Sequence, residues 1–179
     1  MFKFKNFYLT FILFFYFSFT YSQLRIEIKG GIADPINIAV VPIKWELKST
    51  QTTYLHRIIK SDLESFGEFV VLAPESMLSL PTSKEEIYYK DWRLLGVDYL
   101  VIGGIKDSDL DGNTETNYFI FDISREKSIH RGNVIGPIKS LRKIGHKMSD
   151  KIYEKIQGIP GIFSTKLAYI DKPSSEDPN

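Results

Sequence analysis

The feature that most constrains the fold is the stretch Tyr89–Ile105, in which a helix-like segment, a glycine and a long apolar run follow one another. Gly96 can adopt the left-handed backbone conformation that ends a helix, at little steric cost. The run that follows it is nearly continuously apolar and rich in the β-branched and aromatic residues that pack in sheets. A strand of this kind is buried on both faces, so we predict that it lies at the centre of a sheet.

A β-α-β unit is predicted before this central strand. Ile36–Ile43 is apolar on both faces, which predicts a second internal strand. Ser49–Phe66 follows with helical spacing, Gly67 is placed to end that helix, and Glu68–Leu72 returns to a strand pattern. The crossover predicts that the two strands are parallel. The expected inward face of the helix consists of Leu55, Ile58, Ile59, Leu63 and Phe66.

A second helix is predicted to begin at Ser83 and to end at Gly96. Ser83 and Glu86 have the Ser-x-x-Glu spacing of a capping box, in which two side chains bond the free amides of a helix start. Beyond the central strand, Thr116–Ile123 and Lys127–Ile135 are separated by three residues, as expected of a hairpin.

The last predicted helix starts after Pro137 and ends at Gly158. Its inward face is expected to contain Ile138, Leu141, Ile144, Met148, Ile152 and Ile156. Strands and helices alternate first and a hairpin follows. The whole pattern predicts a single α/β domain, a mixed sheet of about five strands with helices packed on it.

Residues 1–22 have the pattern of a signal peptide. Lys3 and Lys5 precede an apolar block of 14 residues, the segment has no acidic residue, and Thr20 and Ser22 suit a cut that leaves Gln23 first. An uncleaved membrane anchor is the alternative, but the block is shorter than the roughly 20 residues that span a bilayer. We therefore expect an exported chain of 157 residues.

Export and composition exclude several classes of function. Removal of two lysines leaves 21 basic against 22 acidic residues, so no overall positive field attracts nucleic acid. The absence of cysteine excludes disulfides, thiolate catalysis, cysteine-ligated metals and lipid attachment through an N-terminal cysteine. These observations favour a soluble periplasmic or secreted protein.

Asp107, Asp109 and Asp111 are the candidate metal ligands. With Gly112 they imitate the first six positions of a calcium-binding loop, but the twelfth position is Tyr118 where a bidentate Glu is needed. The flanking segments are predicted strands, so we favour an Asp-Gly turn, with a weak metal site as the alternative.

The three histidines, His56, His130 and His146, belong to different predicted elements. His146 could pair with Asp150 one helical turn later, but no serine, cysteine or third ligand lies near any of the three at a recognised spacing. We expect surface or packing roles for them.

A lysine ridge recurs every four residues along the last predicted helix. We expect a solvated face, and an acidic partner, a membrane surface or nucleic acid are the alternatives. The ridge consists of Lys139, Lys143, Lys147, Lys151 and Lys155.

Four segments, in chain order, resemble the N-terminal region of TolB, a family of soluble periplasmic proteins of the Gram-negative Tol-Pal system. These segments are Ile38–Trp45, Tyr89–Val101, His146–Glu154 and Phe163–Ile170. The resemblance covers essentially all of residues 23–170. It implies a three-layer α/β domain, similar to anticodon-binding domains and normally followed by a β-propeller that binds the lipoprotein Pal.

The resemblance also implies that the mature N-terminus, here Gln23 to about Asp34, binds the C-terminal domain of TolA. The residues expected to make this contact are Gln23, Leu24, Arg25, Ile26, Glu27 and Ile28. Three apolar side chains alternate with two charged ones in this segment, which suits the addition of a strand to the edge of a partner's sheet.

Unlike the family, these 179 residues contain no propeller sequence after Ile170, so we expect a fragment or a truncated chain. We expect a domain over residues 23–164, and residues 165–179 as the first strand of a missing propeller and a disordered tail. Binding of Pal through a propeller is therefore not expected.

The resulting functional hypothesis is a non-enzymatic periplasmic interaction protein that supports outer-membrane integrity and envelope constriction during division. It needs no cofactor and no small-molecule substrate, and it reaches membranes only through partners. One alternative is a small exported hydrolase or metal-dependent enzyme that uses the three aspartates or His146. The other is a purely structural companion of a propeller.

Overall fold

A computed structural model describes residues 34–109 and 112–165. In these residues six strands form one mixed sheet in the order β3-β1-β4-β5-β6, and β2 pairs with β4. The strands are β1 (Ile36–Val40), β2 (Lys44–Trp45), β3 (Phe69–Leu72), β4 (Tyr99–Asp107), β5 (Asn113–Asp122) and β6 (Lys127–Pro137). The helices are α2 (Leu55–Glu64), α3 (Tyr89–Leu94) and α4 (Leu141–Gln157), with short 3-10 helices at Pro74–Ser76, Lys84–Glu86 and Ile138–Ser140.

The central strand is confirmed. β4 lies between β1, which is parallel to it, and β5, which is antiparallel to it. Leu100, Val101 and Ile102 have no exposed surface, as the continuous apolar run predicts. β1 and β3 are parallel, as the β-α-β prediction requires.

Gly96 ends α3 by the predicted mechanism. Its φ is +70°, and its amide donates to Arg93 O at 3.0 Å. The amide of Val97 donates to Trp92 O at 3.1 Å. These two bonds satisfy the last carbonyls of the helix before the chain enters β4.

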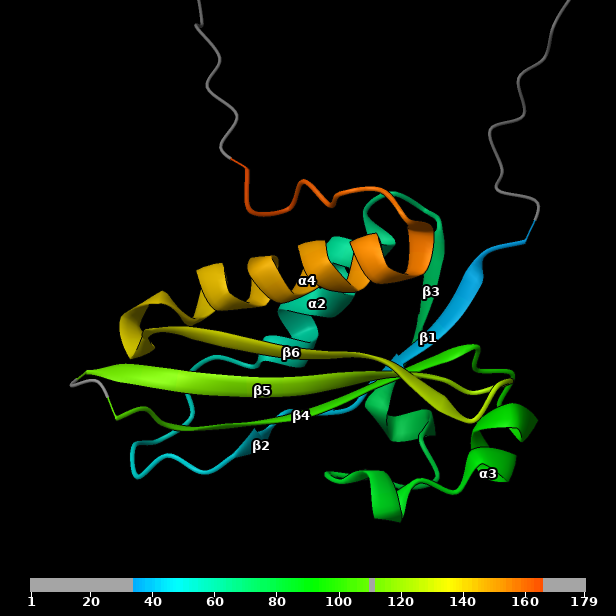
Figure 1. Cartoon of the computed structure of the whole chain (residues 1–179), viewed down its shortest axis with the longest axis horizontal. Helices are drawn as coiled ribbons and strands as arrows, with labels where there is room; N and C mark the ends of the chain where they lie inside the picture. Colours follow the sequence, from blue (N-terminus) through cyan, green and yellow to red (C-terminus); the bar gives the residue numbers. More distant parts are fainter. Residues whose placement is uncertain (1–33, 110–111, 166–179) are drawn as a thin grey trace, which may run out of the picture. The chain divides into compact units, whose positions relative to one another are not determined.

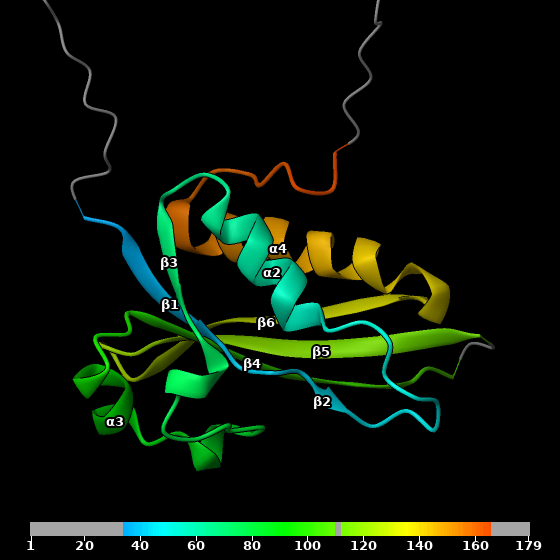
Figure 2. The same ribbon diagram turned by 180° about the vertical axis from the view of Figure 1, so that it is seen from behind.

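The sheet separates two apolar layers, as expected of a three-layer fold. In Figure 1 and, from behind, in Figure 2, α2 and α4 cover one face and α3 lies on the other. The larger core cluster packs under α2 and α4 around Ile38, Val101 and Met148. The smaller one packs Trp92 and Ile102 under α3.

The first predicted helix is shorter than expected. It begins at Leu55 because the chain before it is held as a loop, in which the indole of Trp45 donates to Ser49 O at 2.7 Å. Leu55, Ile59 and Leu63 are buried as predicted. Phe66 lies after the helix and is 44% exposed, so its assignment to the inward face is wrong.

The predicted capping box at Ser83 is wrong. The carboxylate of Glu86 accepts from the amide and the hydroxyl of Thr82, at 2.7 and 3.2 Å, and Ser83 makes no side-chain cap bond. This arrangement closes a single 3-10 turn. Ile87 is then extended and buried, so α3 starts separately at Tyr89.

The second half of the chain follows the prediction closely. β5 and β6 form the expected antiparallel hairpin, with a register shift at Ile120/Phe121. α4 buries Leu141, Ile144 and Met148, and Gly158 ends it at φ +78°. The lysine ridge is largely exposed, as expected of a solvated face.

Candidate functional site

The predicted partner-binding residues Gln23–Ile28 lie outside the described residues, as do the predicted signal peptide and the strand after Thr165. The described chain begins at Asp34 and enters β1 at Ile36. Ile36 lines an open cavity of about 550 Å³.

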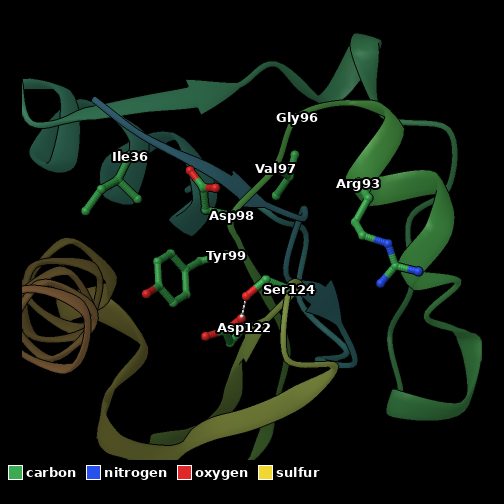
Figure 3. Close-up of a pocket in the computed structure, with 8 residues that line it drawn as sticks. All are labelled: Ile36, Arg93, Gly96, Val97, Asp98, Tyr99, Asp122 and Ser124. Atoms are coloured by element: carbon green, nitrogen blue, oxygen red, sulfur yellow. Dashed lines mark hydrogen bonds between the residues drawn. The ribbon is translucent and has the colours of Figure 1, made fainter. Parts of the chain in front are cut away.

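The cavity lies where β1 and β4 begin and β5 ends (Figure 3). Its lining comes from the α3–β4 connection, from β4 and from the turn after β5. The residues that line it are Ile36, Arg93, Gly96, Val97, Asp98, Tyr99, Asp122 and Ser124. Parallel and antiparallel pairing therefore bring together residues from three distant parts of the chain.

The two carboxylates of the cavity are engaged in structural hydrogen bonds. Asp98 Oδ2 accepts from the amide of Asn37 at 2.9 Å, which fixes β1 to the start of β4. Asp122 Oδ1 accepts from Ser124 Oγ at 2.7 Å and from the amide of Arg125 at 2.9 Å. Burial would raise the pKa of Asp122, but these hydrogen bonds and the charge of Arg125 outweigh it and lower the pKa.

The remaining polar groups of the cavity do not complete a catalytic arrangement. Burial raises the pKa of Tyr99, with the nearby charge of Asp122 acting in the same direction. Arg93 is turned away from the carboxylates in Figure 3 and pairs with Glu126 Oε1 at 2.7 Å. Ser124 donates to a carboxylate and not to a histidine, so it lacks the base that activates a serine nucleophile.

The proposed pairing of His146 with Asp150 is wrong. His146 Nδ1 lies 2.8 Å from Asp62 Oδ2, and this contact joins α4 to α2. Asp150 instead accepts from the amides of Phe163 and Ser164, at 2.6 and 3.1 Å. Its carboxylate is occupied because the chain after Gly158 returns along α4.

Of the aspartate candidates, Asp107 is the last residue of β4 and Asp109 lies in the connection to β5, which agrees with the favoured turn. Asp107 and Asp109 are exposed, Gly112 has a φ of +72°, and Asp111 lies outside the described residues. No group of three potential metal ligands occurs in the part of the chain that the structure describes. The structure therefore adds no support for the metal-dependent alternative.

Comparison with known proteins decides the family. The family described as the TolB amino-terminal domain matches residues 24–129, more than half of the chain. The chain belongs to the TolB family.

Two TolB relatives illustrate how far the likeness extends. The Tol-Pal system protein TolB of Alcanivorax borkumensis is 36% identical over 149 residues, which cover 83% of this chain and 34% of the relative. The TolB of Pseudomonas fluorescens is 35% identical over 148 residues, with the same coverage. The chain thus spans about a third of the length of the curated relatives it matches.

A solved structure agrees with the assignment of the fold. The crystal structure of TolB from Acinetobacter baumannii superimposes with a TM-score of 0.60 at 30% identity, over 73% of this chain and 30% of that one. Within the described residues, no helix combines the length and apolar character that crossing a bilayer requires.

The sequence contained almost no signal for the cavity. Asp98 and Tyr99 follow the recognisable glycine stop, but Asp122 and Ser124 reach them only through the register that pairs Tyr99 with Asp122. That register depends on the whole β4–β5 hairpin, so no local motif reveals it.

Proposed function

We propose that the chain is a non-enzymatic periplasmic interaction protein of the Tol-Pal system, which binds the C-terminal domain of TolA through Gln23–Ile28. The observation that supports this most directly is the family match, which begins at Leu24. Leu24, Ile26 and Ile28 would lie on one face of an added strand, where main-chain bonds supply affinity and alternate side chains supply selectivity. Such contacts serve outer-membrane integrity and envelope constriction during division.

Five residues separate Ile28 from Asp34. Fully extended, such a connection reaches at most about 20 Å. A partner bound at Gln23–Ile28 would therefore be tethered within about 20 Å of the first described residue, Asp34.

The test is calorimetric titration of the purified TolA C-terminal domain into the exported chain. Replacement of Leu24, Ile26 and Ile28 by Asp should reduce the affinity at least about 100-fold, because three apolar contacts of roughly 1 kcal/mol each are lost. The matched control replaces Arg25 and Glu27 by Ala on the opposite face, where we expect a change of less than about fivefold.

The fold of each variant is checked by its amide NMR spectrum, which should be unchanged for residues 34–165. Affinity that survives the three Asp substitutions in a folded chain would refute the proposal. Equal loss in the control would also count against strand addition, because both faces would then matter alike.

A further inference from the structure

The outer edge of β6 is the longest unpaired strand edge in the described part of the chain. β6 spans 11 residues and is last in the sheet order, whereas β3 at the opposite end spans four. On the side away from β5, the backbone groups of β6 pair with no other strand among the described residues. Unpaired edge groups of this kind can hydrogen-bond to an extended peptide.

α4 lies over β6 and runs antiparallel to it (Figures 1 and 2). Near one end of the strand, a Cβ on Gly136 would lie 3.5 Å from Ile144 Cδ1. Near the other end, burial and then the charges of Lys155 and Lys151 lower the pKa of His130, which agrees with close approach of these lysines.

A groove of about 540 Å³ runs between the strand and the helix. Its walls are residues 130–135 of β6 on one side and Lys147, Asp150 and Lys151 of α4 on the other. Gly132 and the ring of Tyr118 form part of its lining, and a Cβ on Gly132 would lie 2.2 Å from Tyr118 Cζ. Glycine therefore allows the aromatic ring to pack directly under the strand.

The positive charge along this groove is only partly neutralised. Lys147 is exposed and makes no ion pair with any described residue. Lys151 and Lys155 share the single carboxylate of Glu154, at 2.5 and 3.7 Å. Asp150 keeps its negative charge while it accepts from the amides of Phe163 and Ser164, so three lysines against the two carboxylates of Asp150 and Glu154 leave a net charge of +1. An acidic ligand would thus find unpaired positive charge beside an unpaired strand edge.

The spacing of the lysines matches that of a strand. Residues four apart on a helix are separated by about 6 Å along its axis. Alternate residues of a strand are separated by about 6.8 Å and point to the same face. In a strand beside β6, three acidic side chains at alternate positions would therefore each lie near one of Lys147, Lys151 and Lys155.

We infer that β6 and α4 form a docking site for an extended acidic segment of a partner protein, which adds to the sheet outside β6. Its acidic residues face the lysines, and its intervening residues lie on the opposite face beside Asn133 and Ile135, the latter 48% exposed. Pairing is confined to about His130–Gly136. A register shift near Ile129 interrupts β6 at one end, and β6 ends at Pro137 at the other. This site is separate from the Gln23–Ile28 segment and does not depend on the function proposed for it.

The probe is a labelled seven-residue peptide with Glu at every odd position and Val or Thr between, titrated into the purified chain at low salt. We expect saturable binding, with slower hydrogen exchange at the amides of His130–Gly136. The double variant Lys147→Glu/Lys151→Glu should weaken binding at least about tenfold, and the pair Lys147→Ala/Lys151→Ala should weaken it about threefold or more. Lys90→Glu, at an exposed position of α3, is the control and should leave the affinity unchanged.

A second peptide separates strand addition from simple charge attraction. It has the same sequence, but alternate backbone nitrogens are methylated, which blocks its hydrogen bonds to β6 and preserves its charge. We expect this peptide not to bind. Equal binding of the methylated peptide would overturn the inference, as would full affinity in both folded lysine variants. Binding to phosphatidylglycerol vesicles with no binding to either peptide would identify a membrane-facing ridge and also overturn it.

Discussion

Among single residues, Glu68 and Tyr153 make a contact that changes the pKa of Tyr153. Tyr153 Oη donates to Glu68 Oε2 at 2.5 Å, and Gln157 Nε2 donates to the same oxygen at 3.3 Å. The hydrogen bond to Glu68, followed by burial, raises the pKa of Tyr153 to about 12. The bond ties the start of β3 to the C-terminal end of α4, so its loss would loosen two elements at once.

The chain should lose stability as the pH rises from about 10 towards 12. Because the folded state raises the pKa of Tyr153, the folded chain holds its proton more tightly than the unfolded chain, and stabilisation is complete only below the unfolded pKa of about 10. Urea denaturation at pH 8, 10 and 11 measures this decline.

With Tyr153→Phe, the free energy of unfolding should fall less steeply with rising pH. It should still fall, because burial also raises the pKa of Tyr118 to about 12. Tyr88→Phe serves as the control, since Tyr88 is 69% exposed. The same slope in all three proteins would show that the Glu68 contact does not govern alkaline stability.

At the scale of elements, α4 organises the segment that follows it as well as the sheet beneath it. Asp150 accepts from two amides and from Ser164 Oγ, and Gly161 passes so close that a Cβ there would lie 2.5 Å from Asp150 Cα. The centroid of the Phe163 ring lies 5.1 Å from that of Phe66 and 5.9 Å from that of Tyr153. One carboxylate and one glycine thus set the path of residues 158–165.

Asp150→Ala should release this segment and leave α4 intact. Two amides lose a charged acceptor, so we expect hydrogen exchange at Phe163 and Ser164 to accelerate about tenfold and global stability to fall by about 1–2 kcal/mol. Asp109→Ala, in the exposed β4–β5 turn, is the control and should change neither quantity. Unaltered protection of Phe163 in the Asp150 variant would contradict the assigned role.

Helices and strands could be predicted from the sequence where a local pattern marks them. Contacts between side chains far apart in the chain could not. Gly96 and Gly158 end helices because no other residue adopts a positive φ so readily, and this is visible in the sequence. The carboxylate of Glu86 accepts from the amide of Thr82, whereas the sequence spacing indicates Ser83 as its partner. The partner of His146 is Asp62, 84 residues away and brought near only by the packing of α2 on α4. The cavity and the groove arise in the same way, from packing between elements.

At the scale of the whole described domain, each face of the sheet has its own apolar cluster, and β4 contributes to both. Val101 and Ile105 belong to the cluster under α2 and α4, whereas Leu100 and Ile102 belong to the one under α3. Loss of either layer would expose one face of the central strand. The two layers should therefore unfold together.

Residues 34–165 alone should fold and melt in a single cooperative transition. Both clusters of the described residues lie within this range, so their members are all kept when residues 1–33 and 166–179 are removed. Calorimetry should give one transition with equal calorimetric and van't Hoff enthalpies. Its midpoint should lie within a few degrees of that of residues 23–179.

A compact state with helical circular dichroism but no dispersed amide spectrum would contradict this prediction. It would favour instead the hypothesis that the domain is a structural companion of a further domain. A cooperative melt would count against that hypothesis.

The place of β1 in the sheet also has a consequence for the order in which the fold assembles. The β4–β5–β6 meander closes through short turns, which form fast. β1 must wait for partners that follow it in the chain, and the amide of Asn37 meets its acceptor Asp98 across 61 residues. During synthesis, the residues of β1 therefore leave the ribosome well before those of β4. The first of the described strands to emerge thus waits until β3 and β4 have followed it, and this unpaired interval is when the growing chain is most exposed to aggregation.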